Sequence, residues 1–246
     1  MSPDITFAHS LADAADAITM ARFRALDLRV DTKPDLSPVS EADRAAEEAV
    51  RSLVAASGRG EGVLGEEFGD DGGDAKWIVD PIDGTTNYVR GVPVWATLLA
   101  LSRDGEVVAS LVSAPALGRR WWAVRGEGCV ADGSPCRVSS VARLEDAAVS
   151  TTSARRMPGG WREVVDRAWS NRGLGDFWQH CLVAEGALDV ACDSVMQVWD
   201  YAPVQLLVEE AGGRCTTYDG GEPSTGSSFV ATNGTLHDEV VSLLAV

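Results

Sequence analysis

The segment from Trp77 to Asn87, WIVDPIDGTTN, constrains the fold more than any other stretch of the chain. Its first three residues are bulky and partly β-branched, and turn-forming residues follow them, which predicts a buried strand. Pro81 has no backbone N–H to donate, so we expect this strand to stop at about Asp80. The Asp-Gly-Thr sequence at 83–85 then predicts a turn that opens a short helix with free N–H groups.

The acids of this segment suit a metal site. Asp80 and Asp83 lie three residues apart at a strand end, just before a helix start, an arrangement that can hold hard cations beside a phosphate. The alternative is an ordinary capped strand–turn–helix with a solvated pair of acids. Acids elsewhere in the chain decide between the two.

Two further acidic positions share the same context. Glu66, with Glu67 beside it, ends a predicted strand over 63–67, and Asp200 lies at the start of a predicted helix over 199–211. If the strands that end at Glu66 and Asp80 are neighbours, their carboxylates converge, and unpaired carboxylates in one pocket repel each other. These motifs contain no basic residue. The sequence therefore predicts bound metal ions, and oxygen ligands favour Mg²⁺ or Mn²⁺ over zinc.

Hydroxyl and backbone groups complete the predicted site. Thr85 stands where it can orient a water held by the metal, and the N–H groups of Gly84 and Thr85 can hold phosphate oxygens. The alternative for Thr85 and Thr86 is simple helix capping.

Composition limits the classes of partner. The chain has 246 residues and a formal net charge of -16, which argues against nucleic-acid and anionic-membrane partners. Phosphate esters remain possible ligands where divalent metals supply positive charge. Five scattered cysteines without C-x-x-C spacing, together with the lack of a signal-like or membrane-spanning apolar run, predict a cytoplasmic protein with reduced thiols.

Helices and strands alternate along the chain in a way that predicts stacked helix and sheet layers. Helices are expected at 5–26, 41–56, 161–169, 176–188, 199–211 and 236–244, and strands at 63–67, 77–80, 94–102, 107–113, 121–125, 189–192 and 230–232. A break near 141–147 suggests that one domain over 1–246 contains two subdomains, 1–143 and 144–246. The three histidines are not expected to be catalytic: His180 is predicted to be packed, and His9 and His237 solvated.

In order along the chain, the motifs GEE at 65–67, DPIDGTTN at 80–87, WD at 199–200 and EAGG at 210–213 resemble the inositol monophosphatase family. The resemblance implies an α/β fold, a five-layer αβαβα sandwich of the inositol monophosphatase and fructose-bisphosphatase type, usually in a homodimer. It also implies hydrolysis of a small-molecule phosphate monoester without a covalent phosphoenzyme. Two to three Mg²⁺ ions would be held by Glu66, Asp80, the Ile82 carbonyl, Asp83 and Asp200. Glu66, Thr85 and Asp43 would be catalytic, and Asp83, Gly84 and Thr85 would contact the phosphate.

Within the family, the stretches at 31–39, 90–96 and 113–117 are most similar to the histidinol-phosphate phosphatases. Asp176 lies where inositol phosphatases tend to carry a small residue, and Asp193 matches an acid that contacts the leaving alcohol. Two acids suit a cationic leaving group, and histidinol phosphate carries an ammonium and a titratable imidazole. The alternative for Asp176 is a helix cap.

Two other functions stay open at this point. One is hydrolysis of inositol 1-phosphate or a related sugar or nucleotide phosphate. The other is a non-catalytic regulator that keeps the fold as an interaction module, although no expected metal-ligand position is broken in this sequence.

Overall fold

The computed structural model describes residues 2–34 and 36–245, so Asp35 of the quoted stretch 31–39 lies outside it. The helices are α1 (Pro3–Arg22), α2 (Glu41–Ala56), α3 (Thr85–Val89), α4 (Gly160–Arg167), α5 (Asp176–Ala184), α6 (Val198–Glu210) and α7 (His237–Leu244). The strands are β1 (Val30–Thr32), β2 (Pro38–Ser40), β3 (Gly62–Gly65), β4 (Gly69–Asp70), β5 (Ala75–Asp83), β6 (Ala96–Arg103), β7 (Glu106–Ala114), β8 (Arg119–Val124), β9 (Gly128–Ala131), β10 (Ser134–Pro135), β11 (Ala148–Thr151), β12 (Ser170–Arg172), β13 (Val190–Met196), β14 (Arg214–Thr216) and β15 (Ser227–Thr232). Among the described helices, none is long and apolar enough to cross a membrane.

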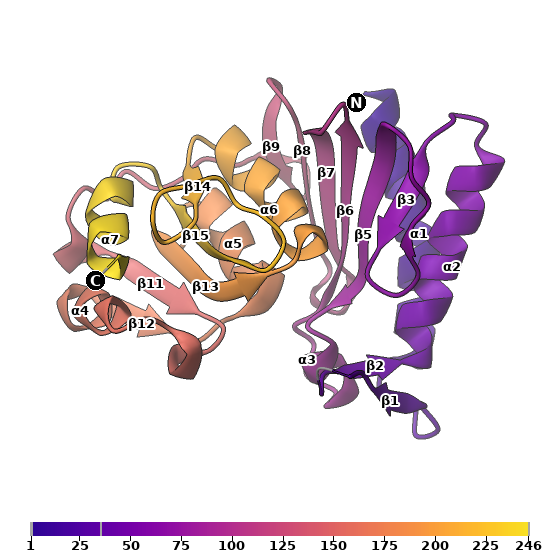
Figure 1. Ribbon diagram of the computed structural model, residues 1–246, viewed down its shortest axis with the longest axis horizontal. Coiled ribbons are helices and arrows are strands. Elements are labelled where there is room, and N and C mark those ends of the chain that lie inside the picture. Colours follow the sequence, from indigo (N-terminus) through magenta and orange to yellow (C-terminus); the bar gives the residue numbers. More distant parts are fainter. Residues whose placement is uncertain (1, 35, 246) are drawn as a thin grey trace.

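These elements stack in five layers, as the family resemblance implied (Figure 1). The pair α1 and α2 covers one face of an eight-stranded sheet with the order β10-β9-β8-β7-β6-β5-β3-β4. Between this sheet and a five-stranded sheet of order β12-β11-β13-β15-β14 lie α5 and α6, and α4 and α7 cover the far face. An apolar core fills each gap between layers. The αβαβα expectation is confirmed.

Helix α2 shows how the sequence positions the site. Ser40 and Asp43 form a capping box at its start. Ala46, Val50 and Val54 face the eight-stranded sheet at helical spacing and are buried. Asp43 lies on this same buried side, so packing of the apolar stripe brings a carboxylate into the interior.

Strand β5 is longer than predicted. It does not stop at Asp80 but continues through Pro81 to Asp83, with an irregularity in its pairing to β6 between Asp80 and Asp83. A bulge leaves a residue without ladder bonds, so the missing N–H of Pro81 costs nothing there. The carbonyl of Pro81 accepts a hydrogen bond from the Thr97 hydroxyl at 2.9 Å.

The two sheets fall on either side of the boundary suggested near residue 143. Helix α6, which belongs to the second half of the chain, nevertheless packs against strands of both sheets. One apolar core therefore joins the halves, and their behaviour as subdomains stays a prediction.

Candidate metal centre and active site

The strands that carry the first two acids are neighbours. Gly65 of β3 pairs with Val79 of β5 in parallel register, and the Glu66 N–H donates to the Val79 carbonyl at 3.2 Å. Glu66, the residue after β3, and Asp80 of β5 therefore lie on neighbouring strands at the same edge of the sheet, which meets the condition set by the sequence argument.

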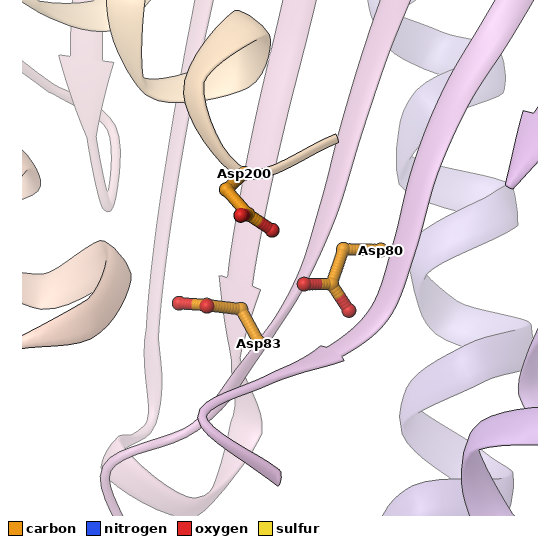
Figure 2. Close-up of side chains that lie close together, drawn as sticks. All are labelled: Asp80, Asp83 and Asp200. Carbon is orange, nitrogen blue, oxygen red and sulfur yellow. The ribbon is translucent and has the colours of Figure 1, made fainter. Parts of the chain in front are cut away.

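Three aspartates converge beside this edge (Figure 2). Asp80 and Asp83 come from the end of β5 and Asp200 from the first turn of α6, and one carboxylate oxygen of each lies within 4.8 Å of the others. The bulge in β5 allows both of its acids to reach the same space, which strict strand alternation over three residues would prevent. Asp80 is 2% exposed.

The charges of these carboxylates are not compensated by protein cations. Among the described residues, no Lys, Arg or His forms an ion pair with Asp80, Asp83 or Asp200. Burial and the neighbouring acids raise the pKa of Asp80 and Asp83 well above the usual value, and burial raises that of Asp200 to about 7. Converging unpaired oxygen ligands fit a hard divalent cation, so the residues present fit the expected metal.

Glu66 lies outside this group of three. Its carboxylate accepts a hydrogen bond from the Lys33 ammonium at 2.7 Å, and the same ammonium donates to Glu67 at 2.6 Å. Although burial alone favours a neutral amine, these two acids raise the pKa of Lys33. The negative charge of Glu66 still reaches the cluster, because it contributes to the raised pKa of Asp80 and Asp200.

Thr85 and Asp43 meet across the site, although they are far apart in sequence. The Thr85 hydroxyl lies 2.9 Å from the Ile82 carbonyl oxygen and 3.3 Å from Asp43 Oδ1. Asp43 also accepts from the backbone N–H of Ser40 at 2.9 Å, and burial raises its pKa. The Ile82 carbonyl that the family resemblance assigns to the metal is thus also within reach of the hydroxyl.

Gly84 makes the turn between β5 and α3 possible. Its φ of +81° is unfavourable for other residues, and a Cβ there would lie 3.0 Å from the Val94 carbonyl oxygen and 3.3 Å from Asp176 Oδ2. Among the described residues, the N–H groups of Gly84 and Thr85 have no acceptor.

Asp176 reaches the site from the first residue of α5. Its carboxylate accepts from Asn87 Nδ2 at 3.0 Å and does not cap the helix, whose N-cap is Gly175. Burial and the nearby charge of Asp193 raise the pKa of Asp176 to about 6. The next residue, Phe177, donates its N–H to Asp83 Oδ2 at 2.6 Å, so α5 also holds a residue of the acidic cluster.

Asp193 is buried in β13 and already has three protein donors. Its carboxylate accepts from Gln179 Nε2 at 2.6 Å and from the Thr152 N–H at 3.3 Å, and it lies 2.9 Å from His180 Nε2. His180 is fully buried, as predicted. His237 is also buried, between two threonines, and His9 is partly buried against Trp122, so the prediction that these two are solvated is wrong.

Sequence reasoning missed the groups that hold the acids in place. Lys33, Asn87 and the Phe177 N–H each meet an acid between 33 and 94 positions away. The one available signal was rarity: Lys33 is one of only two lysines in the chain.

Comparison with known proteins identifies the family and supports the fold. A sequence model of the inositol monophosphatase family matches residues 1–245. The chain belongs to the inositol monophosphatase family. The inositol monophosphatase of Thermotoga maritima has a solved structure with a TM-score of 0.92 and 31% identity, over 99% of this chain and 97% of that one.

Within this family, two similar curated relatives carry the same description. "Histidinol-phosphatase" of Mycobacterium tuberculosis is 52% identical over 98% of this chain and 97% of the relative. "Histidinol-phosphatase" of Streptomyces coelicolor is 48% identical over 98% of this chain and 96% of the relative.

Proposed function

We propose that the protein is a metal-dependent histidinol-phosphatase that hydrolyses L-histidinol phosphate to L-histidinol and phosphate. The observation that carries the reaction class is the convergence of three carboxylates without a basic partner beside the contact between half-buried Thr85 and buried Asp43. The substrate rests on the near full-length similarity to the two relatives described as histidinol-phosphatases. We therefore place the protein in histidine biosynthesis, which agrees with the geometry of the site and with the similarity to these relatives.

Asp80, Asp83 and Asp200 would hold the metal, with Glu66 and the Ile82 carbonyl as further ligands. We infer two to three Mg²⁺ ions, with Mn²⁺ as a substitute, because the donor set consists of oxygen atoms. When bound, such ions neutralise the carboxylates and draw electron density from the phosphoryl oxygens.

The protein groups position the attacking water and the phosphate. The Thr85 hydroxyl donates its proton to the Ile82 carbonyl or to Asp43, so its oxygen is free to accept a hydrogen bond from the water. Glu66 lies near enough for its charge to raise the pKa of Asp43. Burial makes Asp43 a better proton acceptor than an exposed aspartate, because its pKa is raised. The free N–H groups of Gly84 and Thr85 are donors for phosphate oxygens.

Asp176 and Asp193 take different parts in substrate recognition. Asp176 has one protein donor, from Asn87, and retains oxygen lone pairs for the substrate ammonium. The direct contact of Asp193 with the leaving alcohol stays a prediction, since three protein groups already surround its carboxylate. From there Asp193 adds negative charge near Asp176, which favours a cationic substrate over a neutral polyol.

The experiment that tests this function measures phosphate release from histidinol phosphate and inositol 1-phosphate, each with Mg²⁺ and after removal of metal by chelation. We expect Mg²⁺-dependent turnover with a higher kcat/KM for histidinol phosphate. A preference for inositol 1-phosphate would overturn the substrate, and turnover of neither ester would favour the non-catalytic regulator.

We also propose a cytoplasmic homodimer. All five cysteines are free thiols, which fits a reducing compartment. Trp169 is 73% exposed next to β12, the outermost strand at one end of the described five-stranded sheet, and a second copy would cover both. Light scattering should give twice the chain mass for the wild type and a lower mass for Trp169→Glu. A monomeric wild type would reject the dimer.

A further inference from the structure

Helix α2 carries a second buried carboxylate besides Asp43, and the proposed mechanism does not use it. Glu47 follows Asp43 by one turn, so both lie on the same side of the helix, and the Glu47 side chain is 0% exposed. Fully buried carboxylates are rare in proteins and need partners for their oxygens. The partners of Glu47 therefore indicate what it does.

Glu47 binds the backbone of the segment that follows β3. Its Oε2 accepts from the Glu67 N–H at 2.8 Å, and its Oε1 accepts from the Phe68 N–H at 3.2 Å. Arg51, one turn further along α2, donates to Oε1 at 2.9 Å and balances the charge. Hydrogen bonds from N–H groups to a carboxylate are charge-assisted and stronger than neutral ones.

Gly65 allows this contact to be close. A Cβ at position 65 would lie 1.9 Å from Glu47 Oε1, so no larger residue fits unless Glu47 moves. The Glu47 carboxylate thus packs on the last residue of β3 and bonds to the two N–H groups after Glu66. Glu66 itself lies between these anchored positions.

We propose that Glu47 is a positioning residue for the metal centre, holding the turn at 65–68 so that the Glu66 side chain is directed toward the space beside Asp80. Glu47 does not contact the metal or the substrate. The inference rests on the proposed function, since it assigns Glu66 to the metal. The competing explanation is that Glu47 stabilises the fold in general, as any satisfied buried acid does.

Glu61 provides a matched control for that competing explanation. Its side chain is 4% exposed, and it accepts from Arg59, Arg103 and the Trp77 indole N–H. Like Glu47 it is a buried acid held by arginine and N–H donors. It precedes β3, however, whereas Glu66 follows β3, so Glu61 lies at the opposite end of the strand.

The test measures Mn²⁺ binding to the full-length protein by EPR of the free ion, for the wild type, Glu47→Gln and Glu61→Gln. A glutamine has the same shape, but its amide NH₂ cannot accept a hydrogen bond, so at position 47 the turn loses part of its anchor. We expect Glu47→Gln to bind Mn²⁺ about tenfold or more weakly. Glu61→Gln should bind as the wild type does, even where its melting temperature falls.

The steady-state kinetics give a second measurement. The Mg²⁺ concentration for half-maximal turnover should rise in Glu47→Gln, while kcat at saturating Mg²⁺ changes less. If Glu47→Gln does not fold, Glu47→Asp with Glu61→Asp as its control poses the same question, because the shorter side chain withdraws from the two N–H groups.

The outcomes separate this inference from the proposed function. Wild-type Mn²⁺ affinity in Glu47→Gln, or equal losses in both variants, would overturn the positioning role and leave the phosphatase intact. A wild-type protein that binds no Mn²⁺ would overturn the metal centre itself, and the role of Glu47 with it.

Discussion

Asp83 is the residue on which three elements of the structure meet. It ends β5, it lies beside Asp200 of α6, and it accepts the Phe177 N–H from α5. Its raised pKa arises from burial and then from the charges of Asp176 and Asp200. A carboxylate that the fold fixes beside other negative charges is typical of a functional site rather than of an interaction that stabilises the fold.

The first prediction removes this charge with Asp83→Asn. We expect kcat/KM to fall by at least about a hundredfold, because a metal ligand is lost, while the melting temperature without metal stays the same or rises as carboxylate repulsion is relieved. Thermal melts with and without Mg²⁺ check both parts, since the metal should stabilise the wild type but not the variant. An active variant that Mg²⁺ still stabilises would contradict the ligand assignment.

The second prediction isolates the charge of Asp176. This residue has a φ of +49°, which asparagine tolerates well, and an asparagine carbonyl can still accept from Asn87. Asp176→Asn should therefore lower kcat/KM for histidinol phosphate by about tenfold or more, with a much smaller loss for inositol 1-phosphate.

A control for that substitution exists in a hairpin away from the site. Asp104 also has a positive φ, of +53°, and is exposed. Asp104→Asn should leave both activities unchanged. Equal losses for the two esters in Asp176→Asn would remove the ammonium contact from the mechanism.

At the scale of elements, the sequence predicted the parts of the site that depend on local pattern. A strand just before Glu66, a strand that contains Asp80 and a helix start at Asp200 follow from apolar runs broken by acids, and the structure has all three. The predicted end of β5 at Asp80 was wrong, because a bulge lets pairing to β6 resume at Asp83. Whether a strand tolerates a proline depends on its neighbour's register, which one strand's sequence does not contain.

Contacts between distant elements set the rest of the site. Asn87 could be identified as a helix residue, but not as the donor to Asp176 of α5, because the layer order alone brings α3 and α5 together. The same holds for Lys33, which reaches Glu66 from the segment after β1. The residues that neutralise or orient the acids therefore could not be predicted from the spacing of the motifs.

The third prediction concerns the turn from β5 into α3. Gly84→Ala places a Cβ close to the Val94 carbonyl at a φ of +81°, so the turn must shift and carry Thr85 with it. We expect a loss of about 1–2 kcal/mol in stability and a fall in kcat of at least about tenfold, because small misplacements at a site are costly.

Gly105 separates backbone strain from displacement of the site. It has a similar φ of +84°, but nothing lies within 4 Å of a Cβ built there. Gly105→Ala should lose similar stability, measured by urea unfolding, and keep wild-type kcat. If both variants keep full activity, the geometry of the Gly84 turn does not matter for catalysis.

At the scale of the whole molecule, acid acts on stability in two opposite directions. The clustered aspartates have raised pKa values, so protonation relieves their repulsion and favours the folded state as the pH falls. His237 has the opposite effect: its titration lowers stability as the pH falls. It is 1% exposed, its ring nitrogens lie 2.9 and 3.0 Å from the Thr216 and Thr232 hydroxyls, and burial lowers its pKa to about 4.

The last prediction follows from that lowered pKa. Below pH 6.5, the ordinary value for histidine, the unfolded chain binds a proton that folded His237 accepts only near pH 4, so stability is lost as the pH falls through this interval. Between pH 7 and pH 5 the loss from this one group amounts to about 2 kcal/mol. His237→Gln lacks the titrating ring but keeps every other ionisable group. Urea unfolding at the two pH values should therefore show the wild type losing about 2 kcal/mol more on acidification than the variant, although the variant is less stable at pH 7. Equal losses in the two proteins would mean that His237 is protonated in the folded state, and that the threonine hydroxyls around it accommodate the imidazolium.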